Sequence, residues 1–156
     1  MSTAPVAPVR KALVLDANIL IRAVLGRRVL PLLEIYAGRV HFLAPEMAYA
    51  EASAHLPEIL TRRGLAPQQA VTSLVEQTLG RLPVLVTPVP HEVYGDLEPE
   101  ARRRLSGRDE ADWPVLALAL RLGCPIWTED QDFFGSGIPT WTTDRVEIYL
   151  AAELLP

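Results

Sequence analysis

The sequence predicts an α/β domain with a mostly parallel sheet, and three observations support this class. Short apolar runs alternate along the chain with longer stretches of helical periodicity, which is the pattern of strand–helix–strand units. The first run, residues 12–15, has four consecutive apolar residues followed by Asp16, as expected of a strand buried on both faces. The length of 156 residues fits one compact domain.

Five short apolar segments are the expected strands. In order they are residues 12–15, 40–43, 84–87, 125–128 and 140–142. Longer segments that start at polar or proline residues and stop near glycines are the expected helices. In order they are residues 18–25, 29–37, 45–63, 68–79, 92–105, 109–122 and 144–154.

Caps and prolines define the helices in more detail. Asn18 is expected to cap the first helix. Pro57 is expected to kink or split the third helix, and Pro99 predicts a break within the fifth. Pro114 is compatible with the sixth helix only if it lies in the first turn, and Gly123 ends that helix.

The composition excludes several chemistries. Lys11 is the only lysine among 15 basic residues, so the Gly-Lys pair of a phosphate-binding loop is absent, and a lysine Schiff base would need a residue just ahead of a buried strand. Cys124 is the only cysteine, which excludes an intramolecular disulfide and argues against a zinc site built from several cysteines. The net charge of -4 is unlike that of a protein whose whole surface binds nucleic acid.

Residues 1–10 are expected to form a loose, flexible tail ahead of a single domain over residues 11–156. The sequence contains no apolar run of the roughly 18 residues that a membrane span needs. Residues 1–10 also lack the long apolar core of a signal peptide. We therefore expect a cytoplasmic protein.

Acidic residues stand near the ends of the expected strands, where sites form in open parallel sheets. Asp16 follows the first strand, and Asp130 and Asp132 follow the fourth. Neither strand end carries a glycine-rich loop, a histidine or a cysteine nucleophile. Further acids lie in the helix after the second strand and at the start of the helix before the fourth: Glu51, Asp109 and Asp112.

Carboxylates that converge in one crevice repel one another unless a cation holds them together. Hard oxygen ligands select Mg²⁺ or Mn²⁺ over zinc or copper. An ion held by a few acids, with positions left for water, is suited to phosphodiester hydrolysis. It lowers the pKa of a bound water and neutralises charge on the phosphate.

Each acid also has an ordinary structural explanation. Asp16 is a suitable N-cap for the helix that follows it, and the acids that open later helices are suitable N-caps as well. Glu51 fits a solvated helix face, and Asp130 and Asp132 are common turn residues. Asp112 is harder to explain in this way, because it stands at the mouth of an apolar helical stripe. The functional interpretation therefore depends on the joint pattern.

Taken in order, these residues resemble the PIN domain family. The resemblance rests on four features, taken in chain order. They are Val14-Leu15-Asp16-Ala17-Asn18, Glu51 six residues after Pro45, Asp112 opening an apolar helix, and Trp127-Thr128-Glu129-Asp130-Gln131-Asp132-Phe133. It covers nearly the whole chain. It implies a three-layer α/β/α sandwich with a small, mostly parallel sheet, and a nuclease that depends on Mg²⁺ or Mn²⁺ and usually acts on RNA.

The resemblance also implies roles for individual residues. The catalytic acids would be Asp16, Glu51, Asp112 and Asp130, and the metal ligands among them would be Asp16, Asp112 and Asp130. Supporting roles would fall to Asn18, Asp109, Thr128 and Asp132. His55 lies four residues after Glu51 and is a minor candidate neighbour of the site.

Partners follow from the same resemblance. Many compact members are toxins of VapBC-type toxin–antitoxin pairs and many form homodimers, so we expect an RNA substrate, an antitoxin and a homodimer. Apolar faces at 29–36 and 71–79 are candidate dimer surfaces, although core packing explains them equally well. Arginines are candidates for an RNA-binding face, or else ordinary solvated residues at helix ends; they are Arg27, Arg28, Arg62, Arg63, Arg102, Arg103, Arg104 and Arg108.

Other functions remain alternatives at this point. A covalent aspartyl phosphate, as in haloacid-dehalogenase-like phosphatases or receiver domains, needs a lysine facing the acid, and Lys11 instead precedes the strand. A non-catalytic PIN-like RNA-binding or interaction module is disfavoured by the full set of acids. A housekeeping RNA-processing nuclease is not distinguished from a toxin by sequence. Residues 82–107 match no part of the family motif.

Overall fold

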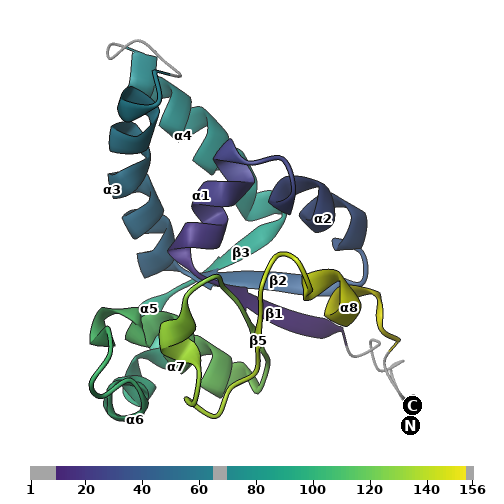
Figure 1. The fold of residues 1–156 in the computed structure, drawn as a ribbon, viewed down its shortest axis with the longest axis vertical. Coiled ribbons are helices and arrows are strands. Elements are labelled where there is room, and N and C mark those ends of the chain that lie inside the picture. Colours follow the sequence, from purple (N-terminus) through teal and green to yellow (C-terminus); the bar gives the residue numbers. More distant parts are fainter. Residues whose placement is uncertain (1–9, 65–69, 154–156) are drawn as a thin grey trace, which may run out of the picture.

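The computed structural model describes residues 10–64 and 70–153. At its centre lies a five-stranded sheet in the order β3-β2-β1-β4-β5, in which all neighbouring strands run parallel (Figure 1). The strands are β1 (Lys11–Leu15), β2 (Val40–Pro45), β3 (Val86–Val89), β4 (Ile126–Trp127) and β5 (Thr140–Trp141). The predicted α/β class is confirmed.

Helices cover both faces of the sheet, which confirms the predicted three-layer α/β/α sandwich (Figure 1). One face carries α1 (Ala17–Leu25), α2 (Val29–Tyr36), α3 (Glu46–Arg62), α4 (Val71–Arg81) and α8 (Val146–Ala151). The opposite face carries α5 (His91–Tyr94), α6 (Glu98–Arg104) and α7 (Trp113–Leu122).

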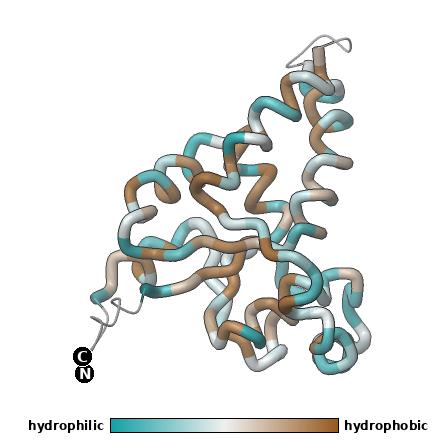
Figure 2. The backbone as a smooth tube through the Cα atoms, turned by 180° about the vertical axis from the view of Figure 1, so that it is seen from behind, coloured by the Kyte–Doolittle hydropathy of each residue, from teal (hydrophilic) through white to brown (hydrophobic). Residues whose placement is uncertain are grey.

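The central strand β1 divides the core between the two faces. Leu13 and Leu15 belong to the larger cluster under α1–α4 and α8, whereas Val14 belongs to the smaller cluster under α5–α7. All three side chains are fully buried, because successive residues of a strand point to opposite faces. Figure 2 shows hydrophobic segments running through the strands in the middle of the molecule.

The order of the strands reverses at β1. After β3 at one end of the sheet, the chain returns to the other side of β1 and forms β4. The carboxyl ends of β1 and β4 therefore border the crevice where open α/β sheets bind ligands. Leu15 pairs in register with Trp127, which brings the next residues, Asp16 and Thr128, side by side.

Several predicted elements have shifted ends. The third strand begins two residues later than predicted, because Leu82–Val84 form a 3-10 turn. The predicted helix 92–105 divides into α5, a 3-10 turn at Gly95–Leu97, and α6. The break therefore precedes Pro99, which lies in the first turn of α6, where proline is tolerated.

The predicted split at Pro57 is wrong. The helix α3 runs unbroken from Glu46 to Arg62, with Pro57 in its interior. Proline removes one backbone donor, but the helix buries side chains at four-residue spacing against the core: Ala48, Ala52, Leu56 and Leu60. This packing outweighs the local penalty of the proline.

Three predicted segments fall partly outside the described residues. Nearly all of the expected tail, the start of the predicted helix 68–79 and the last residue of the predicted helix 144–154 lie there. Over residues 10–64 and 70–153, none of the helices has the length and apolar character that crossing a bilayer requires. The one cysteine, Cys124, is buried and unpaired.

Candidate active site

A pocket of about 460 Å³ lies at the carboxyl ends of β1 and β4. Its lining brings together acids from four separate segments of the chain: Asp16, Glu51, Asp109, Asp112 and Asp130. Among its described lining residues there is no lysine or arginine. The strand order therefore gathers in one cavity the acids that the sequence placed on different elements.

Asp16 follows β1 and is only 7% exposed. Its Oδ1 accepts the Ile19 amide at 2.9 Å and so caps α1, while its Oδ2 accepts the Thr128 hydroxyl at 2.5 Å. The pKa of Asp16 is raised to about 6, chiefly by burial. The charges of Asp130 and Glu51 also raise this pKa, whereas the two hydrogen bonds oppose the rise. The carboxylate is thus held firmly in place, but its negative charge is poorly compensated.

A tight turn after β4 carries the next two acids. The Asp130 amide donates to Thr128 Oγ1 at 2.9 Å, and the Asp132 amide donates to Asp130 Oδ1 at 2.9 Å. Phe133 is fully buried and anchors the turn in the smaller core cluster. Local hydrogen bonds and one buried ring therefore fix the backbone from which Asp130 and Asp132 project.

Asp112 ends the 3-10 turn that precedes α7. Its Oδ2 is buried and has no hydrogen-bond donor among the described residues. Burial, followed by the negative charges of Asp109 and Asp130, raises the pKa of Asp112 to about 7. The neighbouring carboxylates thus disfavour the ionised form of Asp112.

Asp109 and Asp112 differ in their surroundings. Asp109 is exposed and accepts the Ala111 amide at 3.0 Å, which caps the 3-10 turn. The capping explanation therefore fits Asp109. Asp109 also lines the pocket, where its charge acts on Asp112.

The tightest acidic group within the described residues consists of Asp112, Asp130 and Asp132. One carboxylate oxygen from each lies within 4.8 Å of the other two. Asp16 borders this group, because its charge raises the pKa of Asp112 and the charge of Asp130 raises that of Asp16. The group thus contains two of the three predicted metal ligands, Asp112 and Asp130, together with Asp132, which was predicted only as a support. The third predicted ligand, Asp16, lines the same pocket but lies outside this group.

The chemistry of this group fits a divalent cation. Its donors are carboxylate oxygens, which Mg²⁺ and Mn²⁺ prefer. The raised pKa values of Asp16 and Asp112 indicate negative charge that the protein does not neutralise. The buried Asp112 Oδ2 also has no hydrogen-bond donor among the described residues. A doubly charged ion would neutralise the negative charge and would also give this oxygen a partner.

The outer wall of the pocket is more exposed. Glu51 projects from α3 with a side chain that is 56% exposed, and its Oε1 lies 3.9 Å from His55 Nε2. Asn18 and His55 also line the pocket. Asn18 does not cap α1 as predicted, because Asp16 already provides that cap.

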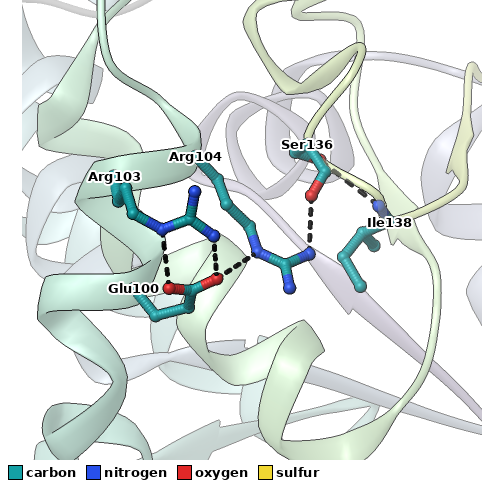
Figure 3. Close-up of polar contacts among 5 residues, drawn as sticks. All are labelled: Glu100, Arg103, Arg104, Ser136 and Ile138. Carbon is teal, nitrogen blue, oxygen red and sulfur yellow. Dashed lines mark hydrogen bonds and ion pairs between the residues drawn. The ribbon is translucent and has the colours of Figure 1, made fainter.

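Most arginines proposed for an RNA-binding face have partners within the protein. Figure 3 shows one such group, in which Arg103 and Arg104 of α6 donate to Glu100. Three other ion pairs join Arg28 to Asp144, Arg62 to Glu58 and Arg102 to Glu98, at 2.5, 2.8 and 3.0 Å. For these residues the alternative explanation, ordinary surface ion pairs, accounts for the contacts.

A contact beside the site is not evident from the sequence. Arg108 Nη1 donates to the backbone carbonyl of Asp132 at 2.8 Å, across 24 positions of sequence. From the sequence, this arginine is a candidate RNA-binding residue because of its positive charge. A contact with a distant backbone carbonyl has no local sequence signal, so only the tertiary structure identifies it.

An α/β/α sandwich with an acidic pocket at the reversal of strand order is the class that these observations define. The family model of the PIN domain matches residues 14–151. The chain therefore belongs to the PIN domain family, as its motifs predicted. A comparison with curated proteins gives no match.

Solved structures include a similar fold. One chain of the crystal structure of VapBC2 from Rickettsia felis, bound to a DNA fragment from their promoter, superposes with a TM-score of 0.60 and 14% sequence identity. The alignment covers 84% of this chain and 98% of that chain. At this identity the likeness shows a shared fold, and the roles of individual residues stay predictions.

Proposed function

We propose that the protein is a divalent-metal-dependent ribonuclease that hydrolyses RNA phosphodiesters, and that it acts as the toxin of a type II toxin–antitoxin pair. The observation that carries the proposal is the convergence of Asp112, Asp130 and Asp132 within 4.8 Å, beside the buried Asp16. Membership of the PIN family supports assignment as a hydrolase.

The metal ligands would be Asp16, Asp112 and Asp130, with Asp132 completing the group around Mg²⁺ or Mn²⁺. Such an ion, when bound, lowers the pKa of a water and neutralises charge on phosphate oxygens. The chain itself orients Asp16 through the Ile19 amide and the Thr128 hydroxyl. Glu51, exposed on the pocket wall, contributes by ligation or by orienting the attacking water.

A second pocket supports a path for RNA. It has a volume of about 370 Å³, lies between α1 and α3, and shares Asn18 and Ile21 with the acidic pocket. Arg22 and Arg63 line it, and within residues 10–64 and 70–153 neither forms an ion pair. These two guanidinium groups would bind backbone phosphates of a strand whose scissile bond lies at the acids.

The proposed antitoxin would insert an arginine among the carboxylates, because a guanidinium forms strong charge-assisted hydrogen bonds with them. The VapBC2 structure supports this kind of partner. Co-purification of a small protein with the chain expressed from its native locus tests the pairing.

A homodimer is also part of the proposal. Ile35 on α2 is 66% exposed and Ile148 on α8 is 62% exposed. Tyr36, next to Ile35, donates to Glu147 Oε2 at 2.8 Å, which ties the two helices together. The apolar face of α4 is a different case, since Val71, Val75 and Leu79 are buried in the core, as the packing alternative predicted.

The structure bears on one rival enzyme. Lys11 Nζ donates to the Tyr149 carbonyl at 2.6 Å, at the opposite end of β1 from Asp16. No lysine in the described chain therefore faces Asp16, which disfavours an aspartyl-phosphate mechanism. The non-catalytic module and the housekeeping nuclease remain the alternatives that experiment must separate.

Cleavage of a fluorogenic single-stranded RNA by wild type and by Asp112→Asn tests the activity. We expect Mg²⁺-dependent cleavage by wild type and background cleavage by D112N. The exposed Glu76→Gln on α4 is the matched control for loss of one negative charge, and it should cleave like wild type. Cleavage retained by purified D112N would refute the assignment of Asp112. Absence of both cleavage and Mn²⁺ binding in wild type would favour the non-catalytic module.

A further inference from the structure

Two arginines outside the pocket hold the turn that carries Asp130 and Asp132. Arg104, the last residue of α6, donates from Nη1 to the Ser136 carbonyl at 2.8 Å. Arg108 donates from Nη1 to the Asp132 carbonyl at 2.8 Å and also to the Phe134 carbonyl. Three carbonyls of one short turn are therefore bound by guanidinium groups from the segment 104–108.

Arg104 is itself held in place from α6. Its Nε donates to Glu100 Oε1 at 2.9 Å, and Arg103 donates to both oxygens of the same carboxylate at 2.9 and 2.6 Å (Figure 3). Figure 3 shows the Arg104 guanidinium between the Glu100 carboxylate and the Ser136 carbonyl. Glu100 thus orients Arg104 toward the turn, whereas Arg103 contacts Glu100 from an exposed position, with a side chain that is 70% exposed.

The sequence of the turn leaves room for both arginines. Gly135 and Gly137 have backbone φ angles of +81° and +88°. Residues other than glycine rarely adopt this backbone conformation. A Cβ on Gly137 would lie 2.8 Å from Arg104 Nη1, and one on Gly135 would lie 3.1 Å from Arg108 Nη2. Glycine at these positions allows the close approach of each guanidinium.

The turn needs external support for a physical reason. The strands that flank it, β4 and β5, are only two residues long. The turn also presents the acids Asp130 and Asp132 to Asp112, and the three carboxylates repel one another at this separation. Without a restraint, this repulsion favours displacement of the turn away from α7.

We propose that Arg104 and Arg108 are positioning residues, which hold the turn of residues 130–137 so that Asp130 and Asp132 meet Asp112 in a geometry that binds a divalent cation. The inference rests on the proposed function for the metal but on separate contacts for the positioning. It also gives a role to α6, which carries none of the acids predicted for the site. Partners that orient metal ligands commonly change metal affinity by about 10- to 100-fold when they are removed.

The test compares Arg104→Gln/Arg108→Gln with Arg103→Gln, a matched control from the same helix that contacts Glu100 but not the turn. The first measurement is amide hydrogen exchange in EDTA over residues 131–138. The relevant amides are hydrogen-bonded in the turn: Asp132, Phe134, Ser136 and Ile138. The second measurement is Mn²⁺ affinity by calorimetry.

In the double variant we expect exchange in the turn to rise about tenfold or more, and Mn²⁺ affinity to fall about 10- to 100-fold. R103Q should stay within about twofold of wild type in both measurements. Unchanged exchange in the double variant would show that the arginines do not hold the turn. Faster exchange with unchanged Mn²⁺ affinity would show that they stabilise the turn without positioning the acids, and would also overturn the proposal.

The two measurements distinguish failure of the positioning role from failure of the proposed metal-dependent function. Wild type that binds no Mn²⁺ would overturn both the metal site and the role of the arginines at it. The exchange data would then still report whether the arginines hold the turn. Circular dichroism and urea unfolding establish that the variants fold; if the double variant does not, Arg108→Gln alone, at an exposed residue, replaces it in both measurements.

Discussion

Replacement of Asp16 by asparagine should stabilise the metal-free protein at neutral and alkaline pH while abolishing activity. Asparagine keeps an oxygen that accepts the Ile19 amide, so the cap of α1 is retained. Its amide group takes the place of the oxygen that now accepts the Thr128 hydroxyl, and that hydroxyl can accept a hydrogen bond instead. The principal change is therefore the loss of a buried negative charge.

The size of the effect follows from the pKa of Asp16, which rises from 3.8 to about 6, chiefly because of burial. The folded chain holds this proton more tightly than the unfolded chain, so ionisation of Asp16 opposes folding. The cost is absent below about pH 4, grows as the pH rises toward the folded pKa of about 6, and is complete near pH 8. A rise of about two pKa units corresponds to about 3 kcal/mol.

Urea unfolding in EDTA measures this cost directly. The free energy of unfolding of D16N minus that of wild type should be about 3 kcal/mol larger at pH 8 than at pH 4. Glu76→Gln, which removes an exposed charge on α4, should show no comparable pH-dependent difference. A D16N protein whose stability relative to wild type is the same at both pH values, or lower at pH 8, would refute the claim that burial leaves this charge uncompensated.

Three further predictions concern metal, RNA and self-association. Mg²⁺ at about 100 times its Kd should raise the free energy of unfolding of wild type, measured by urea unfolding, by about 2.7 kcal/mol. The free energy of unfolding of D112N should not change. Equal stabilisation of both proteins would contradict a metal site at Asp112. Arg22→Gln should raise KM for RNA with little change in kcat and should lower the salt slope of binding by about 1. Arg145→Gln, at an exposed residue just before α8, should do neither. Ile35→Glu should convert a dimer to a monomer in light scattering coupled to gel filtration, and a dimer that persists would place the interface elsewhere.

The sequence located the acids on the correct elements, because each lies beside an apolar segment whose type can be inferred from its pattern. Asp16 follows β1 and Asp130 follows β4, as predicted. The predicted helix 109–122 would include Asp112 in its first turn, whereas Asp112 ends a 3-10 turn and α7 begins at the next residue, Trp113. The order of strands has no such local signal. The return of β4 to the side of β1 places Leu15 in register with Trp127. The expectation that these acids converge came from their positions near strand ends, and the resemblance to the family supported it.

Local rules failed where tertiary packing outweighed them. Pro57 does not split α3, and Gly80 lies inside α4 rather than ending it, because both helices bury one apolar face along their length. Arg104, at the end of α6, and Arg108, four residues later, illustrate a different limit. Their positive charge indicated an RNA-binding face, but Arg104 and Arg108 donate to carbonyls 32 and 24 residues away in sequence, and those contacts depend on the fold.

Capping and metal binding are compatible explanations of the same acids. Asp16 and Asp130 each use Oδ1 to accept a backbone amide at the start of a helical turn, which fixes the orientation of the carboxylate. Hydrogen bonds of this kind lower the pKa of an acid, so an acid that only capped a helix would have a pKa at or below its ordinary value. Asp16 instead has its pKa raised to about 6 in spite of its hydrogen bonds. Its burial beside other carboxylates therefore costs stability that capping does not require, and the binding of a divalent cation gives that cost a functional reason.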